Sequence, residues 1–461
     1  MAIFSRLKRK SKRRVFVLGL DGVPYSMVSG LVAKGKGDWP NFANIFGKKS
    51  VVPMHSVIPT ISSVAWSSFM TGKNPAKHNI FGFIDRVPNP FRIYIPTGKN
   101  MKSETLWEIL SKNDKRVIVI NVPVTYPPRQ VNGILVSGFL ATDLEKATYP
   151  REISSILEDM GYIIDVDPWK AKEDKDQFLR DLFQALEKRI EVMFHFLEQE
   201  KWDFFMCHIM ETDRINHFFW DDWEKGGSKY SQKIIEFYKR IDDLIGKLWE
   251  RLAVEEPSVP KFIVLSDHGF CSTKQEVSIN HWLTQKGWLK LKQIPPKDFT
   301  DIDPTSKAYS LIPGRIFINL KGREEMGSVN PDGEYDELRN EIKSELRELK
   351  NPEIGEAVVK MVYNREDIYS GPFFNYAADL IILPNDGYDL KGKLHTPTLF
   401  DRSHIVGMHT YDDAFLAVAD EDFSQGNLFY RIYDVTPSIL AFMGIPATPD
   451  LDGNNIFSPS Q

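Results

Sequence analysis

The chain has 461 residues, of which 42% are hydrophobic and 26% charged, and its formal net charge is −5. This composition is typical of a soluble globular protein with a large core, and the slight negative charge argues against specific nucleic-acid binding. Only two cysteines occur, Cys207 and Cys271, so no disulfide framework is required and we expect a cytoplasmic location.

The chain begins with a basic segment, R-L-K-R-K-S-K-R-R, that ends at Arg14. We interpret residues 1–13 as a solvated arm, with weak attraction to an anionic membrane surface as the alternative. The apolar run Val15–Leu20 stops at Asp21 after six residues, which is shorter than the apolar region of a secretion signal. No apolar run approaches the length of a membrane span. Val15–Leu20 is therefore predicted to be a buried strand.

Several short runs rich in β-branched residues predict strands that are buried on both faces. These runs are Val15–Leu20, Val117–Asn121, Ile134–Ser137, Phe204–Ile209, Phe262–Ser266, Leu380–Leu383 and Phe415–Val418. Helical patterns separate them, such as the apolar stripe from Ile234 to Leu252. The sequence therefore predicts an α/β fold with a mostly parallel central sheet and helices on both faces.

The pattern changes after Phe270. Residues 271–372 carry connectors rich in Pro and Lys, a short strand at Arg315–Leu320 and a charged helix at Glu337–Lys350. We interpret this segment as an inserted α+β cap. The core is then residues 14–270 and 373–461, and the main sheet is expected to resume at Leu380.

Acidic residues and histidines lie at or near the ends of several predicted strands, and one of them, His409, stands just before the last strand. They are Asp21 in L-G-L-D-G, Asp213 and His217 in M-E-T-D-R-I-N-H, Asp267 and His268 in L-S-D-H-G-F, and His409 in G-M-H-T-Y-D-D-A-F. Taken alone, each of these residues has a plain structural explanation, as a turn residue, a member of a pair on a helix surface or a loop histidine. We interpret His78 and His208 as such loop histidines. Together they lie where ligands bind to open parallel sheets, and they suit one or two Zn²⁺-like ions.

A Ser-rich stretch, P-T-I-S-S-V-A-W-S-S-F-M-T-G-K-N-P-A-K-H-N-I-F-G, runs from Pro59 to Gly82. Hydroxyl residues at a helix start usually act as caps. Beside two metal ions, which can clamp the attacking and leaving oxygens of a displacement at phosphorus, one of these serines would be a nucleophile.

In this order, the motifs resemble the alkaline phosphatase superfamily, specifically its type I phosphodiesterase/nucleotide pyrophosphatase family. The resemblance runs from about Arg14 to Phe457 and includes the closing Y-D-V-T-P-S-I-L-A-F-M-G-I-P and L-D-G-N. It implies a two-metal phosphohydrolase that forms a phosphoserine, most plausibly on a phosphodiester or pyrophosphate. The alternatives are a phosphomonoesterase, a phosphoryl transferase and a non-catalytic, metal-stabilised binding protein.

The resemblance also implies roles for individual residues. One metal would be held by Asp213, His217 and His409, with His404 the weaker candidate for the late histidine. The other would be held by Asp21, Asp267 and His268, with the nucleophile as a further ligand. The nucleophile is placed at Ser62, with Ser63 as the runner-up. Zn²⁺ is the expected metal, and Mn²⁺ or Fe would suit the same ligands.

One departure bears on the substrate. Nucleotide pyrophosphatases of this family carry an Asn that contacts phosphate, and here Gly82 or Phe83 stands in its place. The expected substrate is thus a small phosphate ester of a nucleotide, sugar or lipid. Other candidates to contact phosphate are Asn79, Lys73 and Arg86, which we expect to be structural or exposed. From the cap, Arg315, Lys321 and Arg323 are further candidates, which we expect to lie on the solvated surface.

Overall fold

The computed structural model describes residues 13–33, 39–255, 258–424 and 429–457. The predicted basic arm lies outside the described residues, apart from Arg13. Within the described ranges, no helix combines the length and the apolar character that crossing a bilayer requires.

A nine-stranded sheet forms the centre of the molecule. Its strands, in spatial order, are β20 (Tyr430–Arg431), β2 (Val51–His55), β19 (Ala414–Val418), β9 (Lys261–Leu265), β1 (Val15–Leu20), β8 (Phe204–Ile209), β5 (Val117–Ile120), β6 (Gly133–Val136) and β7 (Thr148–Tyr149). The central run from β9 to β6 is parallel, whereas β19 is antiparallel to both of its neighbours and β7 is antiparallel to β6. The predicted mostly parallel sheet is confirmed.

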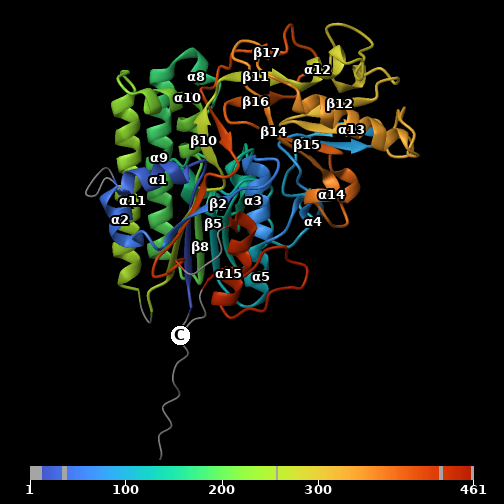
Figure 1. Ribbon diagram of the computed structural model, residues 1–461. Coiled ribbons are helices and arrows are strands. Elements are labelled where there is room, and N and C mark those ends of the chain that lie inside the picture. Colours follow the sequence, from blue (N-terminus) through green and yellow to red (C-terminus); the bar gives the residue numbers. More distant parts are fainter. Residues whose placement is uncertain (1–12, 34–38, 256–257, 425–428, 458–461) are drawn as a thin grey trace, which may run out of the picture.

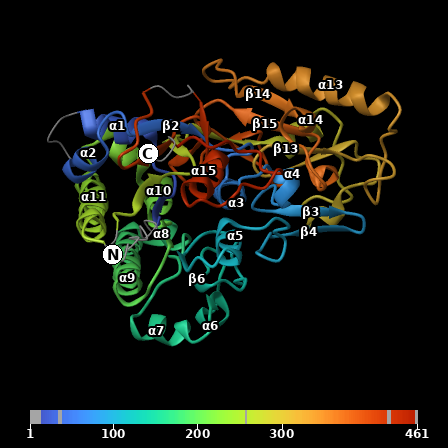
Figure 2. The same ribbon diagram turned by 90° about the horizontal axis from the view of Figure 1, so that it is seen from below.

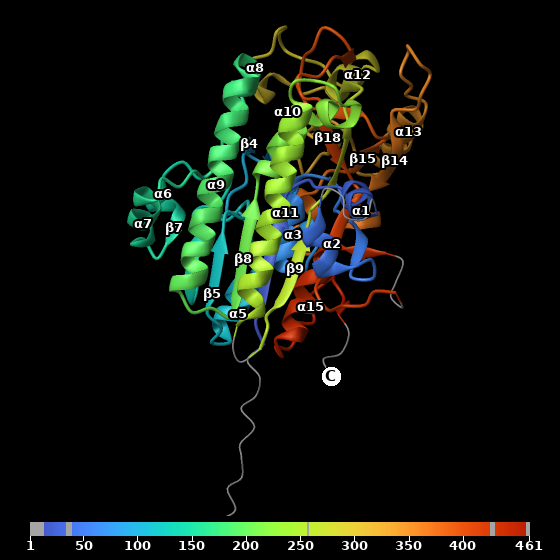
Figure 3. The same ribbon diagram turned by 90° about the vertical axis from the view of Figure 1, so that its left-hand side faces the viewer.

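Helices cover both faces of this sheet (Figure 1, Figure 3). One face carries α1 (Tyr25–Ala33), α2 (Pro40–Phe46), α9 (Lys175–Gln199), α10 (Glu211–Lys225) and α11 (Ser231–Ala253), and the other α3 (Ser62–Thr71), α5 (Leu106–Lys112) and α15 (Val435–Phe442). Alternate residues of β1 enter the two cores: Phe16 and Leu18 pack on the α9–α11 side, and Val15 and Val17 on the α3 side. This is why the strand sequences are apolar without a break.

The cap lies to one side of the central sheet (Figure 2). It holds a four-stranded sheet of β12 (Ala308–Leu311), β13 (Arg315–Ile318), β15 (Leu380–Pro384) and β14 (Val359–Asn364), and a three-stranded sheet of β16 (Tyr388–Lys391), β11 (Gln275–Ser278) and β17 (Phe400–Asp401). Its helices are α12 (Ile279–Gln285), α13 (Glu334–Arg347) and α14 (Arg365–Ile368). These elements share an apolar core of their own.

The expectation that the main sheet resumes at Leu380 is wrong. Leu380 pairs with Ile316 of β13 and with Asn364 of β14, inside the cap sheet. The central sheet resumes only at Ala414, the first residue of β19. An apolar run shows that a strand is buried but not which sheet buries it, because the pairing partners lie far away in sequence. The predicted domain limits as a whole stay predictions.

The remaining elements connect these parts. They are β3 (Asp85–Pro88) and β4 (Phe91–Tyr94), β10 (Gly269–Ser272) and β18 (Gly407–Thr410), the helices α4 (Pro75–His78), α6 (Leu144–Ala147), α7 (Ile153–Asp159) and α8 (Lys170–Glu173), and short 3₁₀ helices at Phe299–Asp301, Phe374–Tyr376 and Ile432–Asp434. The antiparallel pair β10–β18 matters most for the site, because it sets Phe270 opposite His409.

Candidate active site

The carboxyl ends of three adjacent parallel strands meet at one edge of the central sheet. Asp21 directly follows β1, Asp267 follows β9 and Asp213 lies in the first turn of α10, just after β8. All three carboxylates are buried. Neighbouring parallel strands end at the same edge, which is why residues far apart in sequence converge here.

Ser62, Asp21, Asp267 and His268 form one group, which we call the serine cluster. The Ser62 hydroxyl lies 3.2 Å from Oδ1 of Asp21 and 3.1 Å from Nε2 of His268. The same Nε2 lies 3.4 Å from Oδ1 of Asp21 and 3.3 Å from Oδ2 of Asp267. Ser62 is the first residue of α3, so the start of that helix points its nucleophile candidate at the strand ends.

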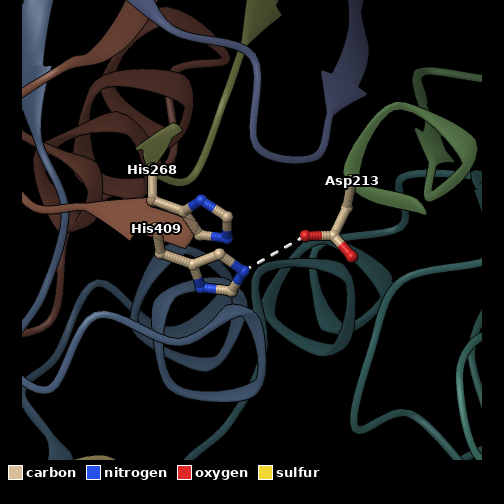
Figure 4. Close-up of side chains that lie close together, drawn as sticks. All are labelled: Asp213, His268 and His409. Atoms are coloured by element: carbon tan, nitrogen blue, oxygen red, sulfur yellow. Dashed lines mark hydrogen bonds and ion pairs between the residues drawn. The ribbon is translucent and has the colours of Figure 1, made fainter. Parts of the chain in front are cut away.

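Asp213, His217 and His409 form a second group, the histidine cluster. Nε2 of His409 lies 3.2 Å from Oδ1 of Asp213 and 3.0 Å from Nε2 of His217, and His217 Nε2 lies 3.3 Å from the same carboxylate oxygen. The rings of His268 and His409 stack with centroids 3.6 Å apart, which joins the two clusters (Figure 4). His268 is therefore also close to the histidine cluster, and Asp213, His268 and His409 have ligand atoms near enough to share an ion.

The separations in both clusters suit metal ions. Ligand atoms about 2.0–2.1 Å from a tetrahedral Zn²⁺ lie about 3.3 Å from one another, and the contacts above span 3.0–3.4 Å. Nδ1 of His268 contacts the carbonyl oxygen of Gly269, and Nδ1 of His217 that of Gly407. Because a carbonyl only accepts, each Nδ1 donates, and each Nε2 keeps a lone pair for a metal.

The electrostatics of the metal-free site favour cation binding. Burial, reinforced by the neighbouring charge of Asp21, raises the pKa of Asp267 well above its ordinary value. Oδ2 of Asp267 is buried and has no hydrogen-bond partner among the described residues. Burial also lowers the pKa of His268 to about 3, so this ring stays neutral. Buried carboxylates beside neutral imidazoles lack compensating charge, which a divalent cation supplies.

Asp213 differs from Asp267. Burial by itself raises the pKa of Asp213, but the imidazoles of His217 and His409 outweigh it and hold the pKa well below its ordinary value. The guanidinium of Arg214 also lies 3.1 Å from Oδ2 of Asp213. Asp213 is thus ionised throughout the neutral range, as a metal ligand must be.

Two residues that orient Asp21 were missed at the level of sequence. Nε2 of His208 lies 2.8 Å from Oδ2 of Asp21, and the indole N–H of Trp66 donates to the same oxygen at 3.0 Å. These contacts leave Oδ1 to face Ser62. We interpreted His208 only as a structural histidine. The signal that could have found it is its place in β8, a strand that is otherwise apolar and fully buried.

The structure also distinguishes between the alternative site residues. The Ser63 hydroxyl is buried without a hydrogen-bond partner among the described residues, whereas Ser62 contacts the cluster. His404 is exposed, whereas His409 lies in the histidine cluster. The geometry therefore favours Ser62 over Ser63 and His409 over His404.

The candidate phosphate contacts from the cap are occupied elsewhere. Arg315 is only 1% exposed and forms an ion pair with Asp85, and Arg323 forms a buried pair with Asp379. The expectation that these two arginines lie on the solvated surface is wrong, because buried carboxylates bind both of them. Arg315 joins the cap to Asp85 of β3, and Arg323 pairs with Asp379 within the cap. Lys321 is exposed, as expected.

The candidates near the Ser-rich stretch are structural too. Lys73 forms an ion pair with Asp450, and Arg86 forms a buried pair with Glu324. The Asn79 side chain donates to a main-chain carbonyl oxygen at 3.1 Å. No replacement for the missing phosphate-binding Asn appears among these three described residues.

The comparisons with known proteins show the family and the fold. The sequence profile of the type I phosphodiesterase/nucleotide pyrophosphatase family matches residues 15–412, most of the chain. The chain belongs to this family. It is therefore a metal-dependent phosphoric ester hydrolase. Among curated protein sequences, none matches the chain.

Solved structures show that the fold is shared widely. Human ectonucleotide pyrophosphatase/phosphodiesterase 5 superposes with a TM-score of 0.56 at 15% identity, covering 96% of this chain and 97% of that one. Phosphonoacetate hydrolase from Sinorhizobium meliloti 1021 superposes with a TM-score of 0.63 at 16% identity, covering 94% and 96%. Murine ectonucleotide pyrophosphatase/phosphodiesterase 5, as an inactive variant in complex with AMP, gives a TM-score of 0.57 at 13% identity, covering 96% of this chain and 97% of that one.

Proposed function

We propose that the protein is a two-metal phosphodiesterase that acts through a phosphoserine at Ser62. The observation that carries this proposal is the position of the Ser62 hydroxyl, within 3.2 Å of both Asp21 and His268 and beside a second set of metal-type ligands. A structural serine at a helix start would need only backbone partners.

The metal ions would be divided between the two clusters. Asp21, Asp267 and His268, with the Ser62 oxygen, would hold one ion, and Asp213, His217 and His409 the other. When bound, such ions lower the pKa of a coordinated hydroxyl and neutralise charge that builds up on phosphate oxygens. The mixture of carboxylate and imidazole suits Zn²⁺ best, and Mn²⁺ or Fe would fit the same ligands.

The chain's own residues set the course of the reaction. The Ser62 hydroxyl donates to Oδ1 of Asp21, so its proton already points at an acceptor. As the Ser62 Oγ–P bond forms, the P–O bond to the leaving group breaks, and its electron pair leaves with that oxygen, which takes up a proton. Water then attacks phosphorus, the Ser62 Oγ–P bond breaks, and Ser62 regains its proton.

The start of α3 supports the same step. The N-cap residue of α3 is Ile61, whose apolar side chain accepts no hydrogen bond from the first N–H groups of the helix. These N–H groups and the positive end of the helix stabilise negative charge on a phosphate bound beside Ser62.

A phosphate diester of a small molecule is the proposed substrate. The nucleotide complex of the murine relative makes nucleotides one candidate class. The family's phosphate-binding Asn is replaced here by Gly82 or Phe83, neither of which has a side-chain amide to offer to phosphate. A phosphomonoesterase, a phosphoryl transferase and a non-catalytic binding protein are the alternatives, and the rate on monoesters relative to diesters separates the first from our proposal. The cytoplasmic location and the membrane attraction of the basic arm also stay predictions.

The test compares two neighbouring serines. The zinc-loaded protein is assayed on bis(p-nitrophenyl) phosphate, with Ser62→Ala as the variant and Ser63→Ala as the matched control. We expect Ser62→Ala to lower kcat by at least about 1,000-fold and Ser63→Ala to retain activity. A metal-replete wild type that hydrolyses no phosphate ester would overturn the proposal, as would an active Ser62→Ala.

A further inference from the structure

A cavity of about 210 Å³ lies between the core and the cap, next to the candidate active site. His217 and His409 of the histidine cluster form part of its wall, but none of the four residues of the serine cluster does. The histidine cluster therefore faces the cavity directly, whereas Ser62 does not line it, although its chain neighbours Thr60 and Ile61 do.

The walls of this cavity are mainly apolar. Ile61 and Met408 line it, and each is the chain neighbour of a site residue. From the cap come Ile312 in the β12–β13 turn and Ile382 and Leu383 in β15. Burial of an apolar group against such walls is the main favourable contribution that the cavity can make to binding.

The charged residues at the cavity pair with one another. Lys360 lies 2.8 Å from Asp412, and Lys391 lies 2.5 Å from Asp389. Each of these described lysines is therefore neutralised by a carboxylate. Asp386 adds a further negative group to the wall. This balance disfavours a second phosphate group, such as the polyphosphate of a nucleotide, in the cavity.

We propose that the cavity binds the leaving group of the substrate, and that this group is an apolar alcohol, either aryl or alkyl. The proposal rests on the function proposed above. In displacement at phosphorus, the attacking and leaving oxygens lie roughly in line. With Ser62 as nucleophile, the leaving oxygen lies across phosphorus from it, toward the histidine cluster and the cavity.

The test uses methyl 4-alkylphenyl phosphates with alkyl groups from methyl to hexyl. The alkyl chain hardly changes the acidity of the phenol, so differences in rate report binding of the leaving group. Each methylene buried in the transition state raises kcat/KM by up to about fourfold. We expect a rise of at least about tenfold along the series. In a second series, of p-nitrophenyl alkyl phosphates, the alkyl group of variable length belongs to the part of the substrate that stays bonded to phosphorus. We expect kcat/KM to change little along this series.

A pair of variants ties the effect to the cavity. Ile312→Ser makes the cavity wall polar, and Ile354→Ser makes the same change at a cap residue that is 57% exposed and outside the cavity. We expect Ile312→Ser to abolish most of the rise in kcat/KM along the first series, and Ile354→Ser to leave that rise unchanged. Calorimetric titration of methylphosphonate and hexylphosphonate into the zinc-loaded wild type adds a measurement without turnover, in which hexylphosphonate binds more tightly.

Each result supports or overturns the inference. If kcat/KM does not rise along the first series, or rises as steeply along the second series, the inference is overturned, while the proposed function stands. Failure to hydrolyse bis(p-nitrophenyl) phosphate would instead overturn the proposed function itself. Equal binding of the two phosphonates would also count against the cavity.

Discussion

Nε2 of His208 lies 2.8 Å from Oδ2 of Asp21, and neither side chain is exposed to solvent. Nδ1 of the same ring lies 3.0 Å from the carbonyl oxygen of Asn121, at the end of the neighbouring strand β5. His208 therefore bridges three strands of the central sheet, because Asp21 follows β1 and His208 lies in β8. Such partners behind a metal ligand fix its orientation.

Replacing His208 by Leu is expected to lower metal affinity or kcat by about 10- to 100-fold, because Oδ2 of Asp21 loses one of its two buried partners and keeps only Trp66. His208→Gln, which can still donate a hydrogen bond, should recover most of the loss. Chelator competition measures the affinity, and His404→Gln at an exposed histidine is the control. Wild-type metal binding and activity in His208→Leu would contradict the positioning role.

Gly19 of β1 leaves room for the indole of Trp66. A Cβ at this position would lie 2.7 Å from Cη2 of Trp66. We expect Gly19→Ala to displace the indole, weaken its hydrogen bond to Asp21 and lower the free energy of unfolding by about 1–3 kcal/mol. Activity should fall together with the free energy of unfolding.

Gly30→Ala is the matched control for Gly19. Gly30 lies in α1, is exposed, and has nothing within 4 Å of an added Cβ. Because Ala favours helix, this change should raise stability by about 0.5–1 kcal/mol. Urea unfolding of both variants measures the difference, and equal stability of the two would show that the close approach of Trp66 is not limiting.

Removal of divalent metal is expected to lower the melting temperature as well as the activity. Ions bound only by the folded state stabilise it, and Asp21 and Asp267 are left buried side by side without them. Scanning calorimetry after chelation, and after addition of Zn²⁺, Mn²⁺ or Fe²⁺, measures the effect and ranks the metals.

Asp267→Asn tests the cause of that destabilisation. The amide removes the carboxyl whose pKa is raised by burial and by Asp21. The metal-free variant should therefore melt at or above the temperature of the metal-free wild type, while added metal should stabilise it much less. A metal response equal to that of the wild type would exclude Asp267 as a ligand.

The buried His78 is expected to make the folded protein less stable in acid. Burial, with Lys73 nearby, lowers the pKa of His78 to about 3 in the folded protein. Its Nδ1 accepts from the Ile80 N–H, and its Nε2 contacts the Ser68 hydroxyl, so the folded state requires the neutral ring. The unfolded chain, with a pKa near 6.5, takes up the proton first. Stability therefore falls as the pH falls below about 6.5, by about 2 kcal/mol at pH 5 from this residue.

The variant His78→Asn should show a shallower fall in stability between pH 7 and pH 5. Urea unfolding at several pH values gives the slope of stability against pH for both proteins, without any measurement of activity. Identical slopes for variant and wild type would mean that other groups account for the acid sensitivity.

Local sequence patterns suffice to find buried strands but not to assign each strand to its sheet. The strands Val15–Leu20 and Phe204–Ile209 were predicted to the residue, because each is a short, mainly apolar run. Leu380–Leu383 was also recognised as a strand, and it forms most of β15 (Leu380–Pro384), but it was assigned to the wrong sheet. Apolar periodicity reports burial, whereas pairing depends on residues far along the chain.

The sequence by itself determined the residue types of the candidate site. Asp21, Asp213 and Asp267 come soon after strands of a parallel sheet, whose carboxyl ends meet at one edge, and the motifs resemble a family of phosphohydrolases. Only the tertiary structure decided which of two adjacent serines faces them, that His208 and Trp66 hold Asp21, and that Arg315 and Arg323 are buried in ion pairs. These outcomes depend on side-chain directions and on contacts between β1, β8, α3 and the cap, which are set by packing in three dimensions and leave no local mark in the sequence.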